Sequence, residues 1–177
     1  AGLFVRGGLY LRAGERLKGR GGETLAGLFR LGIVAGLLEV LVDWALIHWV
    51  RNGRLVYLTG NDVVMLGSPL WMPLAWACVT VELGYPAVRL FALLRGRMAE
   101  RAAALVASLV ASLVAAAGAG LTIGLYEYFA WRANWWKYER AHAMIGQACA
   151  LYIPLGEFVM FLFALPVAAR ALADQDE

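Results

Sequence analysis

Four apolar stretches, each long enough to form a helix across a bilayer, constrain this chain more than any other feature. They lie at about 24–50, 63–94, 102–131 and 142–170, and a hydrocarbon layer of about 30 Å needs roughly 20 helical residues. The chain is 62% hydrophobic and only 16% charged, which is far from the balance of a soluble domain. The sequence therefore predicts an all-α, polytopic membrane protein in which residues 24–177 form one four-helix bundle.

The basic residues indicate how the predicted bundle is oriented. Residues 1–23 are basic and lack the long apolar core of a secretory signal, so we interpret them as an amphipathic arm on the membrane surface. One side of the membrane collects Arg6, Arg12, Arg16, Lys18, Arg20, Arg30, Arg89, Arg95, Arg97, Arg101 and Arg170. The other side holds Arg51, Arg54, Arg132, Lys137 and Arg140. The positive-inside rule then places both termini in the cytoplasm, and we expect the inner, cytoplasmic membrane.

The two halves of the chain, about 24–96 and 101–172, can be aligned as a weak internal repeat. Asp43 aligns with Glu127, and Pro69 aligns with Pro154. Two spans separate the copies, so the halves would be helical hairpins related by an axis along the membrane normal. Pro69, Pro73 and Pro154 lie within predicted spans, where each would free a backbone carbonyl and bend its helix.

Five acidic residues lie within the predicted spans: Glu39, Asp43, Glu82, Glu127 and Glu157. An acid at the bilayer centre costs about 2.5–3.5 kcal/mol on insertion scales, so such residues usually face the protein interior, pair or mark a functional site. We expect Glu39, Asp43, Glu127 and Glu157 to share a cavity that opens outward. The same acids would suit a proton path, but four helices make a poor permeation pathway without oligomerisation.

Small residues recur every four positions in the third span. They are Ala104, Ser108, Ser112, Ala116, Gly120 and Gly124, and Gly32 and Gly36 form a shorter patch in the first span. Helices associate in a bilayer through close van der Waals contact, which such a groove permits. The groove predicts tight packing, either within this chain or against a partner subunit.

Several other kinds of site find no support in the sequence. The two cysteines match no ligand or redox spacing, and His48 and His142 form no Glu-x-x-His pair, so we expect no metal. No serine lies in a nucleophile-elbow context. The basic residues lie mostly at helix ends, where anionic lipid headgroups account for them, and we expect membrane lipid rather than nucleic acid as a partner.

The segment "NWWKYERAHAMIGQACALYIPLGEFVMF" resembles the pattern of the lycopene cyclase domain family, integral membrane proteins that cyclise the ends of linear carotenoids. The matching residues are Glu127, Trp136, Tyr138, Gly146, Pro154, Leu155, Glu157, Phe158 and Phe161. The resemblance covers about 35 residues well and about 90 with the weaker first copy. It departs from the family where two consecutive acids are replaced by Gly156 and Glu157.

The resemblance implies binding of an isoprenoid, a carotenoid or another lipid, with no other cofactor. The aromatic residues expected to contact this ligand are Trp44, Trp71, Trp76, Tyr152, Phe158 and Phe161. One alternative is a cyclase, in which Glu157 protonates an alkene and the other three cavity acids, Asp43, Glu127 and Glu39, belong to the catalytic set. Since half of the acid pair is missing, we favour a binding or accessory role, in which other membrane subunits are the partners.

Overall fold

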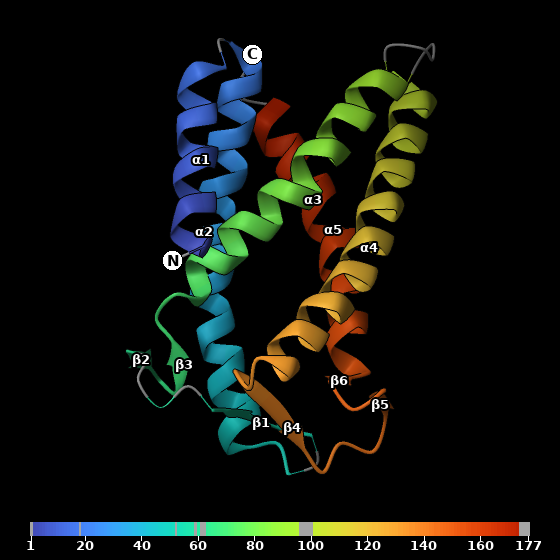
Figure 1. Ribbon diagram of the computed structural model, residues 1–177. Coiled ribbons are helices and arrows are strands. Elements are labelled where there is room, and N and C mark those ends of the chain that lie inside the picture. The colour runs from blue at the N-terminus through green and yellow to red at the C-terminus, as the bar shows by residue number, and fades with distance from the viewer. Residues whose placement is uncertain are drawn as a thin grey trace.

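The computed structural model describes residues 2–17, 19–51, 53–58, 60, 63–95 and 101–173. These residues form five helices and six short strands (Figure 1). The helices are α1 (Gly2–Arg16), α2 (Arg20–His48), α3 (Met72–Arg95), α4 (Arg101–Arg132) and α5 (Tyr152–Ala173). The strands are β1 (Arg54–Tyr57), β2 (Val64–Met65), β3 (Ser68–Pro69), β4 (Trp136–Glu139), β5 (Met144–Ile145) and β6 (Cys149–Ala150).

Three of the described helices contain a segment long and apolar enough to cross a membrane. These segments are Gly21–His48, Met72–Leu94 and Ser108–Arg132. In α5 the described apolar segment, Tyr152–Phe163, is shorter. α2 packs against α3, α4 packs against α5, and contacts between α3 and α4 join these two hairpins. The strands all lie at one end of the helices (Figure 1).

Two predicted spans begin later than hydropathy suggests. Residues 63–71 and 142–151 were expected to be helical, but they form the β2–β3 and β5–β6 hairpins with their flanking turns. Leu66 and Gly67 have φ values of 54° and 88°, as the two central residues of a tight hairpin turn require. Short apolar hairpins satisfy their backbone groups by pairing, so an apolar composition does not distinguish them from the first turns of a span.

The prediction that prolines bend the helices is wrong for all three residues. Pro69 lies in β3, while Pro73 and Pro154 are the second and third residues of α3 and α5. Backbone N–H groups in the first turn have no partner within the helix, so a proline there removes no hydrogen bond. Pro73 and Pro154 therefore lie at the beginning of helices rather than at bends, and Pro69, which lies in a strand, does not hold the place of Pro154 that the repeat alignment predicted.

α2 and α3 approach closely where Gly32 and Gly36 face the start of α3. A Cβ atom on Gly32 would lie 2.5 Å from the Cα of Ala77, and one on Gly36 would lie 2.4 Å from the Cα of Pro73. No side chain can occupy such a separation, because carbon atoms in contact lie about 3.5–4.0 Å apart. The glycine patch predicted in the first span therefore sets the distance between α2 and α3.

The second half of the chain repeats the order of elements of the first. In each half a long helix is followed by a four-residue strand, a two-stranded hairpin and another helix. The corresponding strands β1 and β4 pair antiparallel, with Arg54 opposite Glu139 and Tyr57 opposite Trp136. The first residue of each strand thus faces the last residue of the other, so a local two-fold axis passes through the centre of this ladder.

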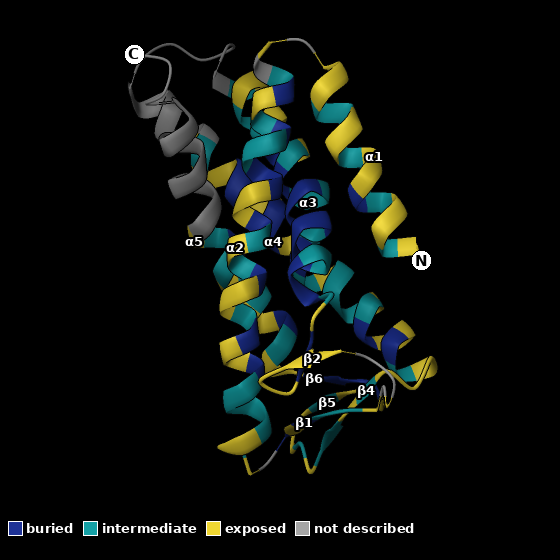
Figure 2. Cartoon of the chain, turned by 90° about the vertical axis from the view of Figure 1, so that its left-hand side faces the viewer, coloured by how far each residue is buried: buried dark blue, intermediate teal, exposed yellow. Residues whose placement is uncertain are grey.

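The N-terminal segment does not lie across the helices as an arm in the membrane plane would. Residues 2–16 form α1, which runs alongside α2 and also contacts α3 (Figure 1). One face of α1 is exposed, while α3, which it contacts, is largely buried (Figure 2). Gly7 is buried in α1, and a Cβ there would lie 2.8 Å from a Leu74 methyl group. Small residues in a basic helix permitted this packing, which the charge pattern did not reveal.

Candidate functional site

A cavity of about 870 Å³ lies between the two hairpins, and we call it the chamber. All five helices contribute to its wall, together with β1 and β4. α3 and α4 converge at the end away from the strands and diverge towards the strands (Figure 1). The chamber is therefore bounded by helices along its sides and by strand residues at one end.

Four acidic residues line the chamber. Glu39 and Asp43 come from α2, Glu127 comes from α4, and Glu157 comes from α5. These are the four acids that the sequence predicted to share a cavity. The chain brings them together because α2 and α4 hold corresponding places in the two hairpins, and α5 returns beside α4.

Asp43 is held by two hydroxyl groups. Its Oδ2 atom accepts hydrogen bonds from the Tyr57 hydroxyl and from Ser68 Oγ, each at 2.6 Å. The side chain is only 3% exposed. Burial raises the pKa of the Tyr57 hydroxyl well above its usual value, and the adjacent Asp43 carboxylate raises it further. Tyr57 therefore remains a hydrogen-bond donor to Asp43 at any physiological pH.

Glu127 is held in a similar way by residues of β4. Trp136 Nε1 donates a hydrogen bond of 2.8 Å to Glu127 Oε2, and the Tyr138 hydroxyl also bonds this carboxylate. Burial and then the charge of Glu127 raise the pKa of Tyr138 far above its usual range. Each of the two aligned acids, Asp43 and Glu127, is thus fixed by donors from its own half of the chain.

Glu157 differs from these two acids because its Oε2 atom has no hydrogen-bond partner among the residues that the structure describes. That atom is buried, yet no residue in the described part of the chain donates a hydrogen bond to it. A buried acceptor without a donor costs about 1–3 kcal/mol. A carboxyl oxygen kept in this state on the wall of a cavity can bond a group that enters the cavity.

The β1–β4 ladder presents one of its faces to the chamber. Side chains alternate along a strand, so Leu55, Tyr57, Trp136 and Tyr138 lie on the same face, and all four line the chamber. The opposite face carries Arg54, and Lys137 there forms an ion pair of 2.9 Å with Glu139. The ladder is therefore an amphipathic cap over the chamber.

Three tryptophans near the cap form a cluster. The ring centroids of Trp71 and Trp135 are 5.9 Å apart, and Trp136 lies 6.3 Å from Trp71 and 6.2 Å from Trp135. The planes are tilted by between 33° and 58°, so the rings do not form a parallel stack. All three rings line the chamber, and we call them the tryptophan cluster.

The structure places the predicted ligand-binding aromatics in different surroundings. Trp71 and Trp76 line the chamber. Trp44 packs edge-on against Trp49, 4.8 Å between centroids, and lies outside the chamber wall. Tyr152 donates a hydrogen bond of 2.6 Å to the Gly53 carbonyl, also outside the wall.

Phe158 and Phe161 are placed by packing rather than by the chamber. Phe161 belongs to the hydrophobic core that α5 forms with α3 and α4, Phe158 is partly buried against that core, and neither is part of the chamber wall. The apolar character of α5 predicted burial correctly but could not distinguish a core face from a cavity face. Conversely, Tyr57, Trp135 and Trp136 line the chamber, and the clustering of aromatics in the two polar loops was their signal.

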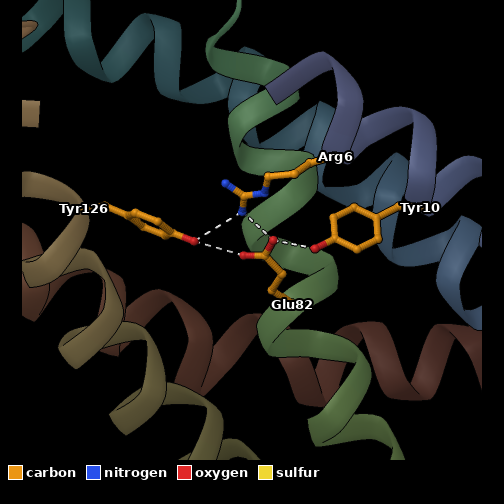
Figure 3. A network of polar contacts seen from close by, with 4 residues as sticks. All are labelled: Arg6, Tyr10, Glu82 and Tyr126. Atoms are coloured by element: carbon orange, nitrogen blue, oxygen red, sulfur yellow. Dashed lines mark hydrogen bonds and ion pairs between the residues drawn. The ribbon is translucent and has the colours of Figure 1, made fainter. Parts of the chain in front are cut away.

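Glu82, the fifth acid within the spans, belongs to a separate network at the wall of the chamber (Figure 3). Its carboxylate pairs with Arg6 of α1 and accepts hydrogen bonds from the hydroxyls of Tyr10 and Tyr126. Arg6 Nη2 also lies 3.2 Å from the Tyr126 hydroxyl. The network joins α1, α3 and α4, and no sequence motif linked these distant residues.

The small-residue groove of α4 is occupied by the chain itself along part of its length. Ser112 and Ala116 are buried, and a Cβ on Gly120 would lie 3.6 Å from the carbonyl oxygen of Pro154 in α5. Ser108 is partly buried. A Cβ on Gly124 would meet no atom within 4 Å. Packing within the chain thus accounts for the middle of the groove, and its end at Gly124 is open.

These features define a helical membrane protein with a partly open chamber lined by acids and aromatic rings. The chain belongs to a family described as a domain of unknown function (DUF6989), whose model matches residues 40–176. That range includes three of the four chamber acids, Asp43, Glu127 and Glu157. It does not include Glu39 or α1. Searches of curated proteins and of solved structures found no match.

Proposed function

We propose that this protein binds an elongated apolar ligand, an isoprenoid such as a carotenoid or another membrane lipid, in the chamber between its hairpins. The carrying observation is the chamber itself. Its volume of about 870 Å³ lies in the range of ligand pockets, roughly 300–1,000 Å³. Its wall combines an apolar surface with a few convergent polar groups, the composition that orients a mainly apolar ligand.

The proposal includes four passes through the inner membrane, with the start of α2 and the end of α5 on the cytoplasmic side, while α1 turns back beside α2 so that Gly2 and Leu3 line the chamber. α5 has 22 residues, which at 1.5 Å per residue gives about 33 Å, enough for a hydrocarbon layer of about 30 Å. The more basic side then corresponds to the end away from the strands. The cap faces outward, and lipid-dissolved ligands would reach the chamber between α3 and α4, where these helices diverge (Figure 1).

The likeness to lycopene cyclases supports the isoprenoid class. Four of the nine residues that carry that likeness line the chamber, namely Glu127, Trp136, Tyr138 and Glu157. Of the two positions that hold the family's acid pair, this chain has Gly156 at the first and Glu157 at the second. The chain therefore has one acid where those enzymes have two. Binding requires only the chamber, whereas turnover also requires a proton donor and a site that accepts the proton afterwards.

Cyclisation is the second candidate, favoured by the unpartnered oxygen of Glu157. The carboxyl group would donate its proton to a terminal alkene, forming a C–H bond and a carbocation on the adjacent carbon. A second double bond of the ligand would then attack that carbon and close the ring. A carboxylate would remove a proton from the ring to restore a double bond. The atoms balance without an oxidant. Glu157→Gln would abolish such a product while leaving the protein inserted.

An accessory role in a larger membrane complex would need a surface for the partner. The small-residue groove suggested such a surface, but α5 fills it near Gly120. We therefore favour ligand binding over an accessory role. Co-purification of other membrane subunits with the wild-type protein would favour the accessory role instead.

Ligand extraction tests the proposal directly. The protein is purified in detergent, extracted with organic solvent, and the extract is analysed by visible spectroscopy and mass spectrometry. We expect about one isoprenoid or other long-chain lipid per protein. Ala75 lines the chamber, so the larger side chain of Ala75→Trp should occupy the chamber and abolish ligand binding. Leu109→Trp, at a position on α4 that is 56% exposed, is the matched control and should retain the ligand. Equal lipid content in both variants would refute the proposal.

A further inference from the structure

The polar groups of the chamber are unbalanced in a way that restricts its ligand. Among the described residues of the wall, Arg6 is the only basic one, and it is already paired with Glu82. Tyr57 donates to Asp43, while Trp136 and Tyr138 donate to Glu127. Most strong donors of the wall are thus engaged with acids of the protein.

The acids of the wall retain capacity to accept a hydrogen bond. Glu157 Oε2 is buried and has no donor in the described part of the chain. Glu39 lies on the same wall and is close enough to interact electrostatically with Glu157. A ligand phosphate or carboxylate would meet these carboxyl groups, and no described residue of the wall offers it an unpaired cation. A ligand group that donates hydrogen bonds would satisfy Glu157.

The tryptophan cluster provides a second, independent preference. The faces of indole rings carry negative potential and attract cations within about 6 Å of the ring centroid. Trp71, Trp135 and Trp136 lie about one such distance from one another and all line the chamber. Tilted rings present faces as well as edges to a ligand. Aromatic faces and carboxyl oxygens are together the usual surroundings of an ammonium group.

We propose that the chamber selects, among long-chain lipids, one that carries a positively charged amino group, which bonds Glu157 and lies against the tryptophan cluster. This inference rests on the proposed ligand chamber and narrows its ligand class. It also predicts discrimination against anionic lipids of the same chain length, because Arg6, the one basic residue among the described residues of the wall, is already neutralised by Glu82.

Three probes with the same chain and different head groups test the selectivity. The protein is reconstituted in phosphatidylcholine nanodiscs with radiolabelled octadecylamine, and bound label is measured after subtraction of empty nanodiscs. Unlabelled octadecylamine, octadecanol and octadecanoate are then compared as competitors. We expect octadecylamine to compete at least about tenfold better than octadecanol, since hydrogen bonds involving charged groups are the stronger ones, and octadecanoate to compete least.

Variants locate the preference within the chamber. Glu157→Gln keeps the shape of the side chain and should reduce retention of the amine about tenfold or more, with octadecanol competing as before. Trp135→Leu, at a position that is 47% exposed, removes one ring of the tryptophan cluster and should also weaken retention of the amine. This second test does not depend on the buried acid. Glu23→Gln, an exposed acid in the first turn of α2, changes the net charge equally and should have no effect.

The outcomes separate this inference from the proposed function. If octadecanoate or octadecanol competes as well as the amine, or if Glu157→Gln and Glu23→Gln retain it equally, amine selection is refuted. A neutral isoprenoid that co-purifies with the protein while octadecylamine is not retained also refutes amine selection, but leaves the proposed function intact. If no lipid co-purifies and no probe is retained, both are refuted.

Discussion

Replacing Gly36 by alanine should separate α2 from α3 and destabilise the protein. The added Cβ would lie 2.4 Å from the Cα of Pro73 and 2.9 Å from the Cβ of Trp76, so the helices must move apart by roughly 1 Å to restore normal carbon contacts. Overpacking of this kind costs typically 1–3 kcal/mol, and the gain in helix propensity from glycine to alanine returns up to about 1 kcal/mol. We expect a net loss of about 1–2 kcal/mol.

Gly124 provides the matched control, because a Cβ there would meet no atom within 4 Å. Gly124→Ala should therefore leave the free energy of unfolding unchanged or raise it by up to about 1 kcal/mol. Both variants can be unfolded by titrating SDS into dodecyl maltoside micelles while helicity is followed by circular dichroism. If Gly36→Ala is as stable as the wild type, or if Gly124→Ala is equally damaging, the close approach of α2 and α3 at Gly36 is wrong.

Three further predictions concern the cap, the cysteines and α1. Tyr57→Phe should lower the free energy of unfolding by about 1–3 kcal/mol, because it removes one of the donors to Asp43; an unchanged SDS midpoint would contradict that bond. Cys149 is 1% exposed, and burial, together with the charge of Glu127, raises its pKa to about 12. Maleimide at mildly alkaline pH should therefore label Cys149 only after unfolding. Rapid labelling of the folded protein would contradict the burial of this thiol. Arg6→Met should speed hydrogen exchange throughout α1 because the contact with Glu82 is lost, whereas Arg12→Met, at an exposed position, should not; equal exchange in both variants would show that Arg6 does not anchor α1.

The helices could be predicted from the sequence, but their first turns could not. Long apolar segments reveal helices because every backbone group in hydrocarbon must be bonded internally. A short hairpin meets the same requirement by pairing, as Val64 does with Pro69 and Met144 with Ala150. Hydropathy averaged over a span cannot detect a change of structure within ten residues. The positive φ of Gly67 marks a turn, and glycine directly before a serine and a proline was its signal.

The acids of the chamber were predictable, whereas most of their partners were not. An acid within a span is costly, which alone indicates that it faces the protein interior. The donors to Asp43 lie 14 and 25 residues away in the chain, and Arg6 lies 76 residues from Glu82. Such pairs depend on how the hairpins fold back, and one sequence carries no signal of that kind. The packing of α1 against α3 was missed for the same reason.

The approximate two-fold symmetry separates the acids that the fold requires from those that it does not. Counted back from the ends of α2 and α4 at His48 and Arg132, Asp43 corresponds to Glu127, and both are held by donors near or in the cap. Glu39 corresponds by the same count to Ile123, so this position in the fold accepts an apolar residue.

Glu157 is likewise an acid in one half only. Counted from the starts of α3 and α5 at Met72 and Tyr152, it corresponds to Ala77, which is fully buried against α2. The sequence alignment of Pro69 with Pro154 would instead pair it with Met72, which is also apolar and buried. The fold is therefore built with an apolar residue at that place, and a carboxyl group there brings the cost of burial without a hydrogen bond to Oε2. A residue that weakens the fold and faces a cavity is best explained by what the cavity binds. By this reasoning Asp43 and Glu127 position the cap, and Glu157 is the residue whose replacement should change ligand binding most.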